Sequence, residues 1–147
     1  MLCPYAIRHC EQMDRFHSGL WRCPALIVSL PADQATSVLQ YLLTLACECQ
    51  NHANILLGRR ALAAMPPDWL ADRIHTAAKT RLNLTDDWEC RRLIEVYAVI
   101  DINLAIAFAE ACSNSQDSEI ATAGREFLDD PQGIAAIARL CLDQPLP

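Results

Sequence analysis

The sequence has 147 residues, 52% of them hydrophobic and 20% charged, which is apolar enough to fill one core and too apolar for intrinsic disorder. The formal net charge of −6 argues against nucleic acid and anionic membrane surfaces as partners, since both require a basic face. No apolar run reaches the roughly 18 residues of a spanning helix, and Arg8, Glu11 and Asp14 exclude a signal peptide, so we expect one soluble, cytoplasmic domain over residues 1–147.

The first thirty residues are expected to form an irregular segment, because Pro4, Gly19 and Pro24 interrupt them. Within this segment, residues 5–16 have the composition of a short helix. The apolar run 25–30 stands between two prolines, which favours an extended conformation.

From Pro31 onward, apolar periodicity and capping residues predict a helical array over residues 31–142. The expected helices cover residues 33–50, 54–65, 68–82, 87–100, 102–109, 117–128 and 131–142. Aspartates stand where helices are expected to begin: Asp33, Asp86, Asp87, Asp101, Asp117 and Asp130. Asp86 with Glu89 has the spacing of a capping box.

Two of these helices, 33–50 and 102–109, carry almost no charge, so we expect both at the centre of the fold. The side chains predicted to be largely buried are Leu42, Leu45, Leu93, Tyr97, Leu104 and Phe108. Gly124 falls in the middle of a predicted helix, where it lowers helix stability by roughly 1 kcal/mol relative to alanine. Its presence there indicates a close approach by a neighbouring helix.

Short connections join the predicted helices into antiparallel hairpins. Three segments share an apolar helix with arginines in its body and a proline or aspartate turn: LLGRRALAAMPPDWLADRI, DDWECRRLIEVYAVID and QDSEIATAGREFLDD. This pattern resembles HEAT-type helical repeats over about residues 54–129. The resemblance implies an all-α fold, an α-solenoid of six or seven stacked helices whose surface binds other macromolecules. It implies no catalytic residue.

Five arginines recur along the predicted hairpins and would share a face if the helices stack in register: Arg59, Arg60, Arg73, Arg91 and Arg92. A guanidinium group makes planar, bidentate contacts with carboxylates, so these side chains are candidate contacts for a partner. The alternative is that they are solvated charges paired with nearby acidic residues. We predict a non-catalytic protein–protein interaction module or scaffold without a cofactor, whose partner and oligomeric state the sequence does not specify.

Two other functions stay open. One is an immunity or inhibitor protein that neutralises a specific partner. The other is a metal-binding or ligand-binding protein, or an enzyme, with a site in the N-terminal third, which a deep polar pocket near His9 and His17 would favour. The metal-ligand candidates in this region are Cys3, His9, Cys10, His17 and Cys23. They lack the C-x-x-C spacing of common zinc sites, so we expect no bound metal.

Overall fold

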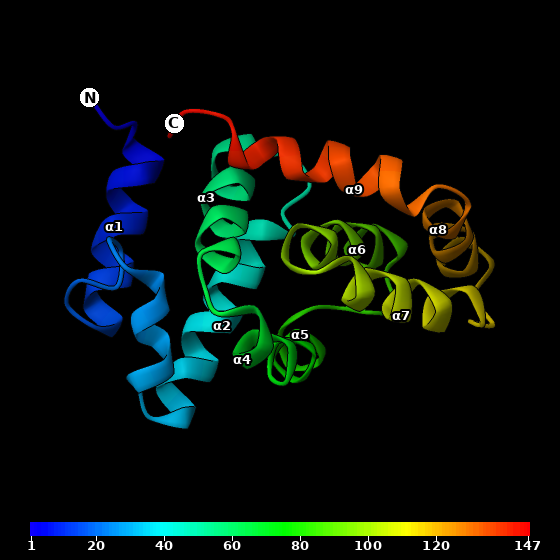
Figure 1. Ribbon diagram of the computed structural model, residues 1–147, viewed down its shortest axis with the longest axis horizontal. Coiled ribbons are helices and arrows are strands. Elements are labelled where there is room, and N and C mark those ends of the chain that lie inside the picture. The colour runs from blue at the N-terminus through cyan, green and yellow to red at the C-terminus, as the bar shows by residue number, and fades with distance from the viewer.

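The computed structural model describes residues 1–147, and it confirms an all-helical fold: helices make up 74% of the chain and no residue lies in a strand. Figure 1 shows the arrangement. The elements are α1 (Pro4–Phe16), η1 (Pro24–Ser29), α2 (Ala32–Ala46), α3 (His52–Ala63), α4 (Pro67–Ala71), α5 (Ile74–Arg81), α6 (Asp87–Ile100), α7 (Ile102–Ser113), α8 (Ser118–Asp129), α9 (Pro131–Arg139) and η2 (Leu140–Leu142). No helix combines the length and the apolar character needed to cross a membrane.

The nine α-helices exceed the six or seven expected, partly because the N-terminal segment is more regular than predicted. The short helix expected over residues 5–16 is confirmed as α1, which begins with Pro4 in its first turn and buries Ala6, His9 and Met13 along one face. The expected extended run 25–30 is wrong, since most of it belongs to the 3-10 helix η1. Pro24 opens that helix with a φ angle suited to a helical turn, and its backbone bonds span three residues.

The helix expected over residues 68–82 is divided into α4 and α5. In a continuous α-helix, the backbone N–H of Arg73 would donate to the carbonyl of Trp69. Here it donates to Leu70 instead, at 3.0 Å, and the Arg73 guanidinium donates to the Trp69 carbonyl, also at 3.0 Å. The side chain thus replaces the backbone donor, and no proline or glycine marks the break in the sequence.

Aspartate side chains cap the N-termini of the four helices in the second half of the chain. The carboxylates of Asp86, Asp101, Asp117 and Asp130 each accept backbone N–H bonds at the start of α6, α7, α8 and α9. The expected cap at Asp33 is wrong, because Pro31 holds the cap position of α2 and Asp33 lies in the first turn. Capping by Asp86 is confirmed, but the carboxylate of Glu89 accepts from the backbone N–H of Asn83, so the reciprocal half of the capping box is absent.

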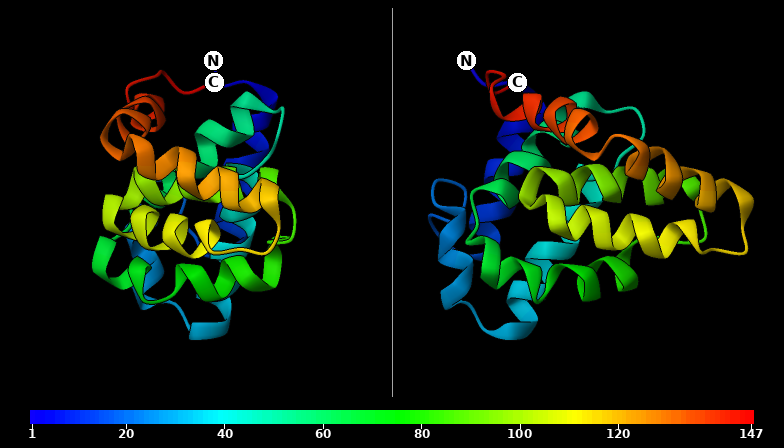
Figure 2. Two further views of the ribbon diagram at one scale, coloured as in Figure 1. Left: turned by 90° about the vertical axis from the view of Figure 1, so that its right-hand side faces the viewer. Right: turned by 45° about the vertical axis from the view of Figure 1, so that its right-hand side comes forward.

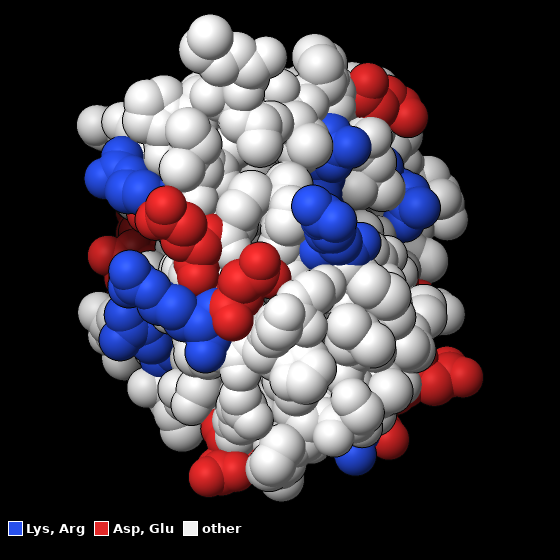
Figure 3. All heavy atoms as spheres, turned by 90° about the vertical axis from the view of Figure 1, so that its left-hand side faces the viewer, with Lys and Arg blue, Asp and Glu red and all other residues white.

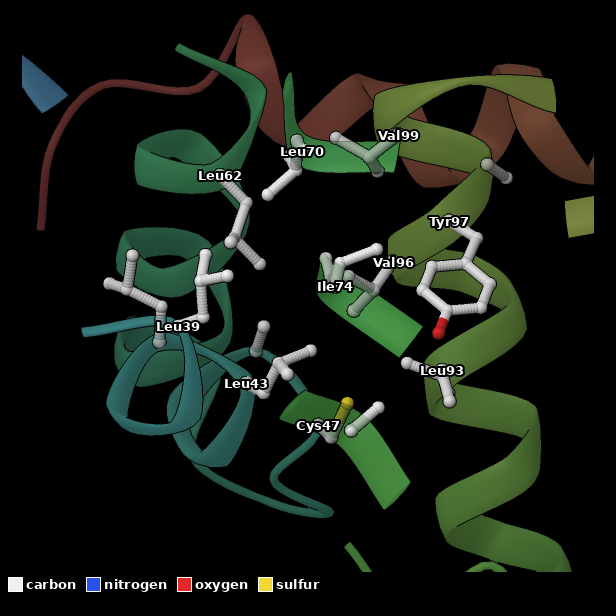
Figure 4. Close-up of a cluster of buried hydrophobic side chains, with 14 of the residues drawn as sticks. Leu39, Leu43, Cys47, Leu62, Leu70, Ile74, Leu93, Val96, Tyr97 and Val99 are labelled. Carbon is white, nitrogen blue, oxygen red and sulfur yellow. The ribbon is translucent and has the colours of Figure 1, made fainter. Parts of the chain in front are cut away.

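The core is centred on α6, which contacts α3, α7, α8 and α9. Figure 2 shows α6 enclosed between α9 and α7. Figure 4 shows how side chains from α2, α5 and α6 meet inside, among them Leu43, Ile74 and Leu93. The remaining core positions are supplied by α3, α4 and the other helices, so one continuous apolar cluster links the two halves of the chain.

Burial of the six predicted core residues is only partly confirmed. Leu42, Leu93 and Tyr97 are buried, whereas Leu45, Leu104 and Phe108 are half-buried. The two misplaced residues on α7 have one cause: this helix carries a single charge, Glu110, yet it lies at the surface and buries only a face of small residues. An uncharged helix is therefore not always a central one.

Glycine allows two helix pairs to approach closely. A Cβ atom placed on Gly124 in α8 would lie 2.4 Å from the backbone oxygen of Ala109 in α7. One on Gly58 in α3 would lie 2.7 Å from the backbone nitrogen of Ala46 in α2. Both distances are shorter than van der Waals contact, so only glycine fits. The close approach predicted at Gly124 is confirmed.

Candidate functional site

The five candidate arginines do not form one face. Arg59 and Arg92 converge on the carboxylate of Glu95, at 2.6 and 3.1 Å. Arg91 pairs with Asp87 and Glu126 on another side of α6. Arg73 is exposed and its guanidinium lies over the ring of Trp69, 4.7 Å from the ring centre.

Arg59 cannot act as the exposed contact that the sequence suggested. It is only 5% exposed, and its Nε donates to the carbonyl of Ala46 while its guanidinium binds Glu95. Arg59 thereby joins the end of α2 to α6 from its position on α3. A buried guanidinium in this setting stabilises the fold because it satisfies acceptors on two other elements.

Beside this ion pair, the structure forms a groove of about 410 Å³ between α3 and α9, which we call the α3–α9 groove. Its floor includes the guanidinium groups of Arg59 and Arg92. Its sides are mainly apolar and include Ile55 and Leu56 from α3 and Ile137 and Leu140 from the C-terminal region. The groove therefore combines fixed positive charge with apolar walls.

Arg92 is fixed in the floor of this groove by hydrogen bonds. Its two terminal nitrogens donate to Glu95 and to the carbonyl of Cys49, at 3.1 and 3.2 Å. Its Nε is buried and has no hydrogen-bond partner within the protein. A buried donor without a partner is uncommon and costs about 1–3 kcal/mol.

The rim of the groove is unusually apolar for a surface. Ile137 is 70% exposed and Leu140 is 56% exposed, and they lie three positions apart at the end of α9 and the start of η2. Cys141, on the inner side, is buried, and this burial raises the pKa of its thiol, so it stays protonated at neutral pH.

The metal-ligand candidates are not brought together. His9 is buried on the inner face of α1, His17 and Cys23 are exposed, and Cys3 and Cys10 are half-buried. The structure contains no group of three or more His, Cys, Asp or Glu side chains arranged to hold a metal ion. His9 instead belongs to an aromatic cluster, in which its ring stacks on Tyr41 and meets Trp21 edge-on.

Arg60 contributes to a different feature, a cavity of about 320 Å³ between α1 and α3 that we call the α1–α3 cavity. It is lined by His9, Trp21, Arg22, Pro24, Leu57, Arg60, Ala61 and Leu146. Arg60 also donates to the backbone carbonyl of Gln144, which fastens the C-terminal segment beside the cavity. Figure 3 shows the face formed by α1 and the segment that follows it, where basic and acidic side chains are interspersed in a largely uncharged surface.

Sequence reasoning missed the groove and most of the cavity. Ile137 and Leu140 fall within the helix predicted over residues 131–142, and only their high exposure identifies them as surface residues. Trp21 and Arg22 lie in a stretch without periodicity. The sequence does contain one indication of this site, the adjacent Trp21 and Arg22. They form part of a site only because the fold brings them beside His9 of α1.

Comparisons with protein-family models, with curated proteins and with solved structures find no match for this chain.

Proposed function

We propose that this chain is a non-catalytic protein-interaction module and that the α3–α9 groove binds its partner. The observation that carries this proposal is the exposure of Ile137 and Leu140 beside a floor of arginine side chains. Arginine is enriched among the residues that dominate binding energy at protein interfaces, and the exposed apolar rim supplies surface that a partner can bury.

The charge and the apolar walls of the groove also indicate which kind of partner would bind there. Two guanidinium groups share the single carboxylate of Glu95, so the floor keeps an excess of positive charge. The matching partner is an amphipathic helix that inserts apolar side chains three or four positions apart between Ile137 and Ile55. An aspartate or glutamate on the same helix would accept from Arg92.

Three further parts complete the proposal. The hairpins α2–α3 and α6–α7 support a scaffold of stacked helices, and the HEAT-type resemblance extends this to a solenoid. Eight cysteines without a disulfide support a reducing compartment, which we take to be the cytoplasm. If the partner that binds the groove is a toxic enzyme, this chain would be its immunity protein, which is a special case of the same proposal.

The test compares groove variants with a variant of an equally exposed apolar residue elsewhere. Ile137→Ser with Leu140→Ser removes the rim, whereas Trp88→Ser changes a side chain that is 57% exposed and outside the groove. Each variant is used to capture partners from cells that express the natural chain, and the captured protein is then titrated against purified variants by calorimetry. Circular dichroism and thermal melts confirm that each variant is folded.

The expected result is a partner that binds the wild type and Trp88→Ser equally and binds the groove variant at least about tenfold more weakly, a loss of about 1.4 kcal/mol. Arg92→Gln should weaken binding and reduce its salt dependence, since a charged contact is removed. Equal binding by all variants would show that the partner uses another surface.

A further inference from the structure

The α1–α3 cavity has properties that the groove does not share. Its volume of about 320 Å³ is at the lower end of the range typical of small-molecule sites, roughly 300–1,000 Å³. Helix α1 and the segment before η1 form one side, and α3 forms the other. A pocket of this size fits a small molecule.

The charge of the cavity is not balanced by the protein. Arg22 and Arg60 both line it, and neither forms an ion pair. No aspartate or glutamate is among the lining residues. In the α3–α9 groove, by contrast, Glu95 partly neutralises the two arginines. Two guanidinium groups without a carboxylate partner, in a chain of net charge −6, therefore mark a local site for an anion, although that of Arg60 also donates to the carbonyl of Gln144.

His9 adds a buried polar group to the cavity wall. The side chain is 3% exposed, and its Nδ1 lies 3.0 Å from the hydroxyl of Tyr41. Its Nε2 has no partner within the protein, although the ring lines the cavity. Burial lowers the pKa of His9 to about 4, so the ring is neutral at pH 7 and offers one hydrogen bond without adding charge.

The remaining walls are apolar. Trp21 meets His9 edge-on, with ring centres 5.9 Å apart, and Leu57 and Ala61 contribute from α3. A ligand must therefore present a flat or compact apolar body to these walls and a single anionic group to the arginines. A dianion such as phosphate lacks that apolar body.

From this geometry we infer that the α1–α3 cavity binds a small organic monocarboxylate with a flat apolar body, at a site separate from the protein-binding groove. The carboxylate lies between the guanidinium groups of Arg22 and Arg60, where bidentate hydrogen bonds are available. The apolar body packs against Trp21 and Leu57, and the Nε2 of His9 makes the remaining polar contact. The inference does not depend on the protein-interaction proposal.

The test uses indole-3-acetate as the probe and the neutral indole-3-acetamide as its matched control, on the full chain at pH 7. Binding is followed by nuclear magnetic resonance, from the shifts of the Trp21 indole N–H and the His9 ring. We expect both signals to shift and saturate with indole-3-acetate, with an affinity at least about tenfold higher than for the amide, as expected for a charge-assisted contact.

Variants locate the site. Arg22 is exposed, so Arg22→Gln leaves the fold intact and should weaken binding of indole-3-acetate at least about tenfold. Arg60→Gln should do the same. Arg92→Gln, in the groove, should leave this binding unchanged while it weakens capture of the protein partner.

Three results would overturn the inference: shifts that do not saturate, equal binding of acid and amide, or full binding by Arg22→Gln. None of these results would affect the groove, because the groove test uses different residues and a different ligand.

Discussion

Replacing Gly124 by alanine tests whether helix packing or helix propensity dominates at the α7–α8 interface. Alanine at a helix interior stabilises by about 1 kcal/mol relative to glycine when nothing else changes. Here the added Cβ would lie 2.4 Å from the backbone oxygen of Ala109 and 2.6 Å from the backbone nitrogen of Ser113. Neither atom can rotate away, so the two helices must separate by roughly half an ångström or more.

Separation of the helices costs more than the propensity gain. Overpacking of a tight contact costs about 1–3 kcal/mol, and a clash with two backbone atoms belongs near the top of that range. The expected net loss is therefore about 2 kcal/mol, or a melting temperature lower by about 4–8 °C for a chain of this size.

Urea unfolding monitored by circular dichroism measures this change. Ala107→Gly is the matched control, because Ala107 is exposed on α7 and its replacement reports propensity alone, a loss of about 1 kcal/mol. An increase in stability for Gly124→Ala would refute the packing argument, since it would mean that the interface accommodates the methyl group without separation.

Two further predictions concern buried polar groups. Arg59→Met should lower the free energy of unfolding by about 1–3 kcal/mol, because Glu95 and the carbonyl of Ala46 lose a donor, whereas the exposed Arg125→Met should change it by less than about 0.5 kcal/mol in the same urea titration. Stability should also fall as the pH is lowered from 6.5 towards 4. Burial lowers the folded-state pKa of His9 to about 4, so over this range only the unfolded chain binds the proton. The expected loss between pH 7 and pH 5 is about 2 kcal/mol, and His9→Asn should lack this component; an identical pH dependence in the variant would contradict the assignment.

Local signals predicted the second half of the fold well. Asp101, Asp117 and Asp130 each begin a helix as expected, because a carboxylate cap acts on backbone groups two or three residues away. The division of α4 from α5 was missed, because it depends on a hydrogen bond made by the guanidinium of Arg73. The sequence does not state which acceptor a long side chain will reach.

The candidate sites were harder to predict than the helices. His9, Arg22, Arg60 and Leu146 line one cavity although they span most of the chain, so no window of the sequence contains the site. Arg59 and Arg60 are adjacent, yet one is buried in an ion pair and the other lines the cavity. Successive residues on a helix point about 100° apart, which is enough to place two identical side chains in different environments.

Asp101 alone connects α6 to α7, as the C-cap of the first helix and the N-cap of the second. A connection of one residue allows little variation in conformation. The orientation of α7 relative to α6 is therefore set by the two backbone torsions of Asp101, φ −157° and ψ 123°. Inserting one residue here would displace α7 relative to α6 and carry Ala105 and Ala109 away from their buried positions. The length of this joint is therefore as constrained as any buried side chain, whereas residues 114–117, between α7 and α8, leave room for a longer connection.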